Sequence, residues 1–313
     1  MILKPLLVAV CFFGLAVVLL GPVPSMLSKA GWAERSPRAA LVLWQAITST
    51  AGLSMVIAAL ALAVAPLAVT FRHGLHVFLT QTLAGRPLDG LGASQVAALS
   101  WAMAIVGWLL ALLARTTMQN ARLRRKHRAR VDLVAERSGR HQGVQVIDHP
   151  AAAAYCLPGV RARVVITSGL IRLLDERELV AVLDHERAHA RGRHHLILLP
   201  FDVLATAVPR LPAVRLARQC AARLVEMLAD DHARRRNGGP VVALALLRLA
   251  ASRAESGPLP QGALGAADHA VVARVRRLTE PVTPVPAWQR VLTYLGAFGL
   301  VAIPMTLLVP CLT

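Results

Sequence analysis

The chain alternates between long apolar stretches and one long segment of mixed polarity. Four stretches contain no Lys, Arg, Asp or Glu and consist mainly of Ala, Val, Leu and other apolar residues. A membrane-spanning helix needs roughly 20 mostly apolar residues, because every backbone polar group must be satisfied inside the hydrocarbon. All four stretches meet that length. We therefore expect membrane spans at about residues 5–28, 39–71, 94–114 and 291–313.

The rest of the chain carries all of its charge, 35 Lys and Arg against 17 Asp and Glu, for a net charge of +18. A chain divided in this way is neither a disordered protein nor a purely soluble enzyme. Between the third and fourth stretches the pattern changes to short elements, with strands expected at 144–147, 155–157 and 163–167, followed by helices. The fold class is therefore an α-helical integral membrane protein with an aqueous α+β domain. Its organisation is three membrane helices within 1–114, the α+β domain at 115–290, and a fourth membrane helix at 291–313.

A basic run follows the third apolar stretch directly. Residues 115–130 contain six arginines, one lysine and no acidic residue. Such runs stay on the cytoplasmic side, so we expect a multi-pass protein of the cell membrane whose 115–290 domain is cytoplasmic and whose N- and C-termini lie outside. Contact with anionic lipid head groups accounts for the run, so the lipid bilayer is an expected partner and direct binding of nucleic acid is not expected.

A metal-binding motif lies on the helix expected after Asp175. His185-Glu186-Arg187-Ala188-His189 has the form HExxH. Residues four apart lie on one helix face, so His185 and His189 can bind the same Zn²⁺ ion. Glu186 would then lie beside the metal, where it can take a proton from water and pass it to a leaving amine. This pattern predicts a zinc endopeptidase with one Zn²⁺ per chain.

Two residues are candidates for the third zinc ligand, and the first is His195. Residues 185–195 fit the longer pattern HExxHxxGxxH, in which Gly192 turns the chain toward a third histidine. Enzymes with that pattern also need a methionine in a tight turn below the metal. The methionines after the motif are Met227, within a helical run, and Met305, within the fourth apolar stretch.

The second candidate is Glu226, which lies in the run Glu226-Met227-Leu228-Ala229-Asp230. A later helix would supply this carboxylate. Asp230, one turn further on, could accept a hydrogen bond from the second ring nitrogen of a ligand histidine, for which we favour His185. Because the methionine turn is missing, we favour Glu226 over His195. His194 and His195 are then interpreted as polar or packing residues that extend the motif helix.

The motifs and their order resemble the BlaR/MecR-type antirepressor metallopeptidases, which are relatives of the HtpX-like and CAAX-prenyl endopeptidases. The resemblance covers nearly the whole chain. It is carried by the membrane topology and by residues 154–159, 164–170, 175–189, 210–212 and 226–230.

This resemblance implies a gluzincin-type metallopeptidase domain in which His185, His189 and Glu226 bind zinc. Glu186 would be the general base and acid, and Asp230 would support a ligand. The strand near Tyr155 would be the sheet edge that pairs with an extended substrate. His269, ahead of Arg274, resembles a distal motif that assists at the oxyanion.

The same resemblance implies a protein substrate, a BlaI-type DNA-binding repressor, whose cleavage would make the chain part of a signal-transduction pathway. Sensor members of the family carry a penicillin-binding domain after the fourth span, but this sequence ends at Thr313 without one. Two alternatives therefore stay open. One is an HtpX-like protease for the quality control of membrane proteins, and the other is a non-catalytic transmembrane signalling protein, against which the intact Glu186 argues.

Overall fold

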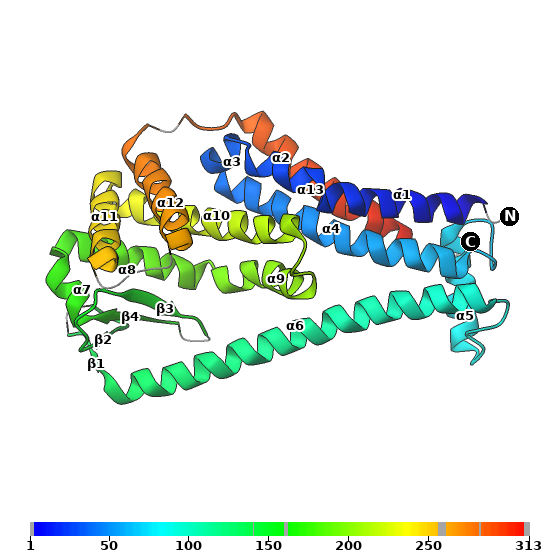
Figure 1. Ribbon diagram of the computed structural model, residues 1–313, viewed down its shortest axis with the longest axis horizontal. Coiled ribbons are helices and arrows are strands. Elements are labelled where there is room, and N and C mark those ends of the chain that lie inside the picture. The colour runs from blue at the N-terminus through cyan, green and yellow to red at the C-terminus, as the bar shows by residue number, and fades with distance from the viewer. Residues whose placement is uncertain (1–2, 140, 160–161, 256–260, 282, 310–313) are drawn as a thin grey trace. The chain divides into compact units, whose positions relative to one another are not determined.

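The computed structural model describes residues 3–139, 141–159, 162–255, 261–281 and 283–309, and these residues are mostly helical (Figure 1). They form two compact units. The helical unit contains residues 3–115, 200–221 and 285–309, and the sheet unit contains residues 116–199 and 222–284 with the gaps given above.

The helical unit is built around its longest buried helix, α4. Its helices are α1 (Leu3–Leu20), α2 (Pro22–Ser28), α3 (Trp32–Arg35), α4 (Pro37–Val64), α5 (Phe71–Leu83), α13 (Ala287–Leu308), the first part of α6 (Ala93–Val134), the end of α9 (His194–Ala207) and the start of α10 (Pro212–Asn237). Both α1 and α13 pack against α4. The side chain of Thr50, which is fully buried, donates a hydrogen bond of 2.9 Å to the carbonyl oxygen of Leu300. The packing and this hydrogen bond tie the first and last long helices of the unit to α4.

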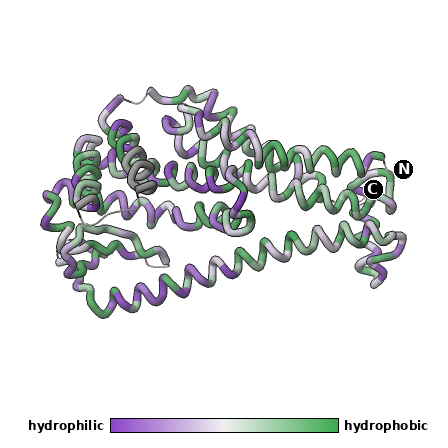
Figure 2. Tube along the Cα trace, viewed as in Figure 1, coloured by the Kyte–Doolittle hydropathy of each residue, from purple (hydrophilic) through white to green (hydrophobic). Residues whose placement is uncertain are grey.

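Four segments of the structure are long and apolar enough to cross a membrane: Leu3–Ser28, Pro37–Val64, Ala93–Val134 and Ala287–Leu308. Four candidate spans were expected, and these confirm them. The outward faces of α1 and α13 carry large apolar side chains such as Phe13 and Phe298, which suit a lipid environment. Along α6 the residues change from apolar to polar, as Figure 2 shows.

Two of these segments differ in length from the expected spans. The second ends at Val64 rather than at residue 71, because Pro66 lacks the amide hydrogen that would continue the helix, and Thr70 then caps the new helix α5. The third continues to Val134, twenty residues beyond the expected end. The basic run does not interrupt this helix, since Arg, Lys, Leu and Ala are all good helix formers.

The sheet unit combines one small sheet with several helices. Its elements are β1 (Ala135–Arg137), β2 (Val144–Ile147), β3 (Ala154–Leu157), β4 (Arg163–Thr167), α7 (Ser168–Leu173), α8 (Glu176–Arg191), the start of α9 (His194–Ala207), most of α10 (Pro212–Asn237), α11 (Gly239–Glu255) and α12 (Gln261–Thr279). The strand order is β1-β2-β4-β3, in which β2 and β4 are parallel and the other pairs antiparallel. Strands β2 and β4 have the bounds expected from the sequence. Strand β3 lies at one edge of the sheet.

The core of the sheet unit lies between the sheet and α8. Val164 and Ile166 of β4 pack with Leu170 and with Leu183 of α8, while Val165 faces the opposite side of the sheet. This alternation is the period of two expected of a strand that is buried on both faces. The motif helix is thus fixed to the sheet by its apolar stripe, which leaves its other faces free for polar residues.

Helix α8 begins directly after Asp175, as expected, and its start has a capping box. The amide of Glu178 donates to Asp175 Oδ1 at 2.9 Å, and the amide of Asp175 donates to Glu178 Oε2 at 3.0 Å. Arg248 of α11 also donates to Glu178, at 2.5 Å. The first turn of the motif helix is therefore held by its own cap and by a neighbouring helix.

Candidate metal centre

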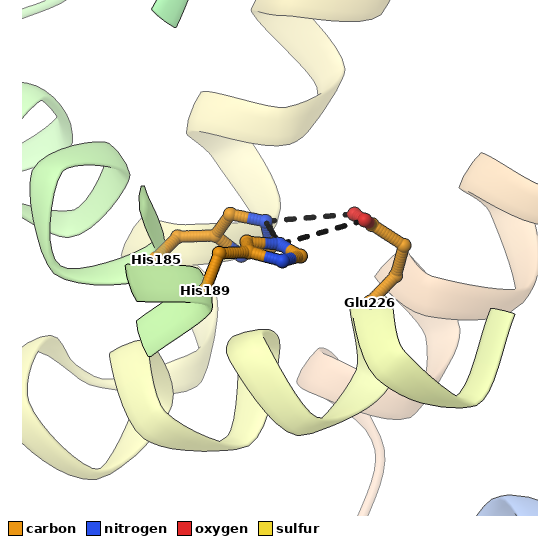
Figure 3. Close-up of side chains that lie close together, drawn as sticks. All are labelled: His185, His189 and Glu226. Atoms are coloured by element: carbon orange, nitrogen blue, oxygen red, sulfur yellow. Dashed lines mark hydrogen bonds and ion pairs between the residues drawn. The ribbon is translucent and has the colours of Figure 1, made fainter. Parts of the chain in front are cut away.

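Two helices bring the histidines of the motif and a glutamate together. Helix α8 supplies His185 and His189, and α10 supplies Glu226. Figure 3 shows the two imidazoles and the carboxylate pointing toward one another. Among the described residues these three form the one group of metal-ligand side chains whose ligand atoms all lie within 4.8 Å of one another. His195, the other candidate for third ligand, is not part of this group.

The distances between the three groups match those around a zinc ion. His185 Nε2 lies 3.2 Å from His189 Nε2, and the Glu226 carboxylate oxygens lie 3.5 Å from His185 Nε2 and 3.4 Å from His189 Nε2. Ligands about 2.05 Å from a tetrahedral zinc ion stand about 3.3 Å apart. Two imidazole nitrogens and one carboxylate oxygen are also a common donor set of catalytic zinc sites. The residues present therefore fit a zinc ion in both spacing and chemistry.

An ion-pair network on the far side of His185 fixes Glu226 and Asp230 of α10. His185 Nδ1 lies 3.1 Å from Asp230 Oδ1, so the nitrogen that faces away from the candidate metal has a carboxylate partner. Arg274 of α12 donates to both oxygens of Asp230 at 2.7 Å, and its third nitrogen lies 3.1 Å from Glu226. A bidentate pair of this kind holds its carboxylate in one orientation. The sequence placed Asp230 behind His185, but it did not identify Arg274 as the residue that holds Asp230.

The network also sets the charges of the site. Burial works against charge on the Glu226 and Asp230 carboxyls, but His185 and Arg274 outweigh it and lower both pKa values to about 2. Burial likewise disfavours the charged imidazole of His185, yet Asp230 and Glu226 raise its pKa to about 9. Both carboxyls are therefore ionised, and Glu226 presents its negative charge to the two imidazoles, where a cation would bind.

Glu186 lies at the junction of two cavities next to these groups. Burial raises the pKa of its carboxyl, and the backbone amide of Cys156 on β3 is hydrogen-bonded to it. The larger cavity, about 580 Å³, is lined by β3, by both histidines of the motif and by Glu226. A substrate segment in this cavity would thus meet Glu186, the three candidate ligands and the edge strand together.

His194 has a position that the sequence did not reveal. It is 93% buried, and its Nδ1 lies 3.0 Å from Nδ1 of His189, with the two rings edge to face. If His189 presents Nε2 to a metal, its Nδ1–H can donate to His194, whose ring must then be neutral. Burial and the neighbouring His189 agree with this, since they lower the pKa of His194 to about 4. The interpretation of His194 and His195 as an extension of the motif helix is wrong, because α8 ends at Arg191 and His194 begins α9. It also misses the direct contact of His194 with a candidate ligand.

Gly192 provides the space for this contact. A Cβ atom at residue 192 would lie only 2.4 Å from His194 Nε2. The imidazole of His194 consequently lies against the backbone of Gly192, which follows the last residue of α8. A glycine followed two residues later by a histidine, just past an HExxH motif, is the signal that could have identified His194.

The remaining predicted site residues lie as follows. Tyr155 is on the edge strand and lines the larger cavity, with its hydroxyl 3.0 Å from His127 Nε2 of α6. His195 lines the same cavity. His269 belongs to α12, but its side chain lies outside the described residues, so its expected role at the oxyanion stays a prediction.

Comparisons with known proteins agree with a protease. Residues 117–255, which include the sheet and all three candidate ligands, match the family model of Peptidase family M48. The chain is 32% identical over 106 residues to a Protease HtpX homolog of Thermoplasma acidophilum, which is 34% of this chain and 29% of that protein. It is 41% identical over 81 residues to the homolog of Pyrobaculum calidifontis, or 25% of this chain and 24% of that protein.

A third Protease HtpX homolog, from Methanothermobacter thermautotrophicus, is 37% identical over 84 residues, or 26% of this chain and 31% of that protein. The chain thus spans less than a third of each of these relatives. No solved structure matches it. The similarities support an HtpX-like membrane metalloprotease of the M48 type, and they lend no support to the narrower BlaR/MecR-type antirepressor.

Proposed function

We propose that this chain is a membrane-embedded zinc endopeptidase that hydrolyses peptide bonds of other proteins. The observation that carries the proposal is the spacing of His185, His189 and Glu226, which fits the edges of a zinc tetrahedron, with Glu186 next to them. The match of residues 117–255 to Peptidase family M48 supports the same reaction.

Each residue of the site has a distinct part in this reaction. Zn²⁺ held by the three ligands would supply Lewis-acid chemistry, which polarises a peptide carbonyl and makes water more acidic. Glu186 accepts a proton from water in the cavity and delivers it to the nitrogen of the scissile bond. Because burial raises the pKa of Glu186, its carboxylate takes up a proton from water more readily than that of an exposed glutamate. Asp230 and Arg274 keep His185 and Glu226 in place.

The edge strand β3 supports an extended substrate. Strand β3 pairs with β4 on one side only, and its outer edge lines the larger cavity beside Glu186. A substrate backbone can add to this edge as a further antiparallel strand. The geometry suits a peptide bond within a chain, so the substrates would be proteins with an extended segment.

The location of the protease in the membrane limits which proteins can be its substrates. The basic run at 115–130, which continues the candidate span of α6, supports a cytoplasmic location of the sheet unit by the positive-inside rule. The likeness to proteases named HtpX homologs favours membrane proteins with exposed cytoplasmic segments as substrates, in a quality-control role.

The reaction is tested with purified full-length protein in detergent or nanodiscs. Wild type is expected to contain about one zinc per chain by mass spectrometry, and His185→Ala is expected to lose it. Glu186→Gln is expected to keep zinc and to lose proteolysis by about 10²-fold or more. Full proteolysis by the Glu186→Gln variant would contradict the assigned role of Glu186, and wild type without bound metal would contradict the zinc site.

The substrate is identified by comparing cells that express wild type with cells that express Glu186→Gln. Fragments that appear only with wild type mark the substrates. Fragments of unrelated membrane proteins would support quality control. Fragments of one BlaI-type repressor would instead support the antirepressor role that the sequence suggested.

A further inference from the structure

The part of α6 that belongs to the sheet unit, residues 116–134, lies along the rim of the larger cavity. Two hydrogen bonds show this. Nε2 of His127 lies 3.0 Å from the hydroxyl oxygen of Tyr155, and Arg128 donates to the carbonyl oxygen of Pro158 at 3.0 Å. Tyr155 and Pro158 both line that cavity. The polar end of α6 therefore borders the space in which a substrate would lie.

Arg124 lies on the same face of this helix as Arg128, one turn before it, and both side chains are half-buried. It is close to His195, which also lines the larger cavity. Burial and the nearby positive charges of Arg124 and Arg193 lower the pKa of His195. His195 is therefore neutral near pH 7, and the positive charge at this part of the rim belongs to the two arginines.

Arg193 has a backbone conformation that arginine rarely adopts. Its φ is 46°, and it is the one non-glycine residue with positive φ in the part of the chain that the structure describes. It directly follows Gly192, the C-cap of α8. A left-handed residue commonly occupies that position at the end of a helix, and it is usually glycine. The backbone thus gains nothing from arginine at residue 193, which points to a role for its exposed side chain.

No acidic side chain neutralises these two arginines. The side chains of Arg124 and Arg193 form no ion pair with any of the described residues. Glu226 lines the same cavity, but its carboxylate is already paired with Arg274 and with the imidazoles of the motif. Two unpaired positive charges beside a cavity attract an anion.

That anion could come from a lipid head group or from the substrate, and the position of Arg124 along α6 favours the substrate. Arg124 lies ten residues past the apolar stretch 94–114, which corresponds to about 15 Å along the helix. The head-group layer is only about 5–7 Å thick on each side of a bilayer. An α6 that leaves the membrane upright therefore carries Arg115 within the head groups and Arg124 beyond them.

We infer that Arg124 and Arg193 bind acidic side chains of the substrate at the rim of the larger cavity. This inference rests on the proposed peptidase function and adds a substrate class to it: extended segments in which Asp or Glu flanks the scissile bond. Both arginines would determine specificity and take no part in the chemistry. One residue of the basic run thus acts on the substrate, besides the contact of the run with the membrane.

The test changes the charge of the rim without touching the metal centre. Arg193→Gly removes one charge and is expected to keep or raise the unfolding temperature, because glycine suits the left-handed backbone of this residue. Arg124→Glu reverses the other charge. Arg125, the next residue of α6, is exposed, so Arg125→Glu is a matched control with the same change of charge on the same helix.

The probes are fluorescein-labelled peptides that share one sequence of Gly, Ser, Ala and Leu and carry a short run of Asp, Asn or Lys at either end. Cleavage is measured with the purified full-length protein in detergent. Binding is measured by fluorescence anisotropy, with each rim variant combined with Glu186→Gln. At low salt the Asp peptide is expected to bind about three- to tenfold more tightly than the Asn peptide, and the Lys peptide more weakly than both. High salt is expected to remove most of this difference.

The rim variants are expected to change this order in a defined way. Arg193→Gly should lose part of the preference for the Asp peptide although its fold is at least as stable as that of wild type. Arg124→Glu should lose more, because it also repels the acidic peptide, and it should improve the Lys peptide. Arg125→Glu should keep the order of wild type.

The two readouts separate this inference from the proposed function. Cleavage and binding without any preference for the Asp peptide, or a preference that Arg125→Glu weakens as much as Arg124→Glu, would overturn the rim and leave the peptidase standing. A preference in binding that depends on Arg124 and Arg193 would support the rim even if wild type cleaved nothing. Equal binding of all peptides together with no cleavage would overturn both.

One further measurement distinguishes the lipid as the source of the anion. Short-chain phosphatidylglycerol is added to the same proteins in detergent, and its binding is followed by native mass spectrometry. If Arg124→Glu and Arg193→Gly lost this lipid while all peptides bound alike, the rim would be a lipid site and the inference would be wrong. Lipid binding that both variants leave unchanged, together with the expected order of the peptides, would support the acidic substrate.

Discussion

The two histidines of the candidate metal centre are supported in opposite ways. His185 faces Asp230, which Arg274 holds by a buried bidentate ion pair, so its support is charged and comes from two other helices. His189 faces His194, a neutral ring only five residues further along the chain. A ligand can thus be oriented by distant charges or by a local neutral acceptor, and the two kinds of support should fail differently when mutated.

Among the residues that support a candidate ligand, the largest effect is expected from Asp230→Ala. This change removes the partner of His185 and also leaves the guanidinium of Arg274 without its bidentate acceptor. The loss is costly because the imidazole of His185 and the guanidinium of Arg274 are both largely buried. Loss of a support of this kind lowers metal affinity by about 10- to 100-fold, and breaking a buried ion pair costs about 3–5 kcal/mol of stability. Zinc retention against EDTA and the thermal unfolding temperature in detergent measure the two effects. A variant with the zinc affinity of wild type would show that His185 does not depend on Asp230.

A smaller effect is expected from changes at Arg274. Arg274→Gln leaves Asp230 beside His185 but frees the orientation of both acidic groups, so zinc affinity should fall by about tenfold, toward the lower end of effects on supporting residues. Arg274→Lys separates charge from geometry, because lysine keeps the positive charge but cannot form two parallel hydrogen bonds. We expect Lys to restore stability more than zinc affinity. Equal recovery of both would mean that Arg274 acts by charge alone.

On the other side of the site, His194→Ala should lower zinc affinity by about tenfold or less while leaving the fold intact. His194→Asn is the informative partner variant, since its side-chain oxygen can accept from His189 near the place of the imidazole Nδ1. Recovery of zinc retention by Asn but not by Ala would identify an orienting role, which a purely packing role does not predict. Gly192→Ala should lower zinc affinity as His194→Ala does, because the added methyl group would displace the ring of His194.

The sequence alone could not reveal how differently His185 and His189 are supported, and the reason is physical. His185, His189, Glu226 and Asp230 lie in pairs four residues apart, so helical periodicity alone predicts which side chains share a face. Arg274 acts across 44 residues through side-chain contacts that no local pattern records. Strand β1 was likewise not expected, because Ala135, Glu136 and Arg137 have no strand preference and pair only because β2 offers an edge. Local periodicity thus predicted the motif helix and which candidate ligands share a helix face, and it missed what tertiary packing supplies.

The smallest effect is expected from His195→Ala, and this variant decides between the two third ligands considered from the sequence. His195 lines the larger cavity but does not belong to the group formed by His185, His189 and Glu226. Zinc content and affinity should therefore stay within about twofold of wild type, because no ligand and no support of a ligand is lost. Glu226→Ala is the comparison, and it should lose zinc almost completely. If His195→Ala lost the metal and Glu226→Ala kept it, the third ligand would come from the end of the motif rather than from α10, and the support that Arg274 gives to Glu226 would have no part in metal binding.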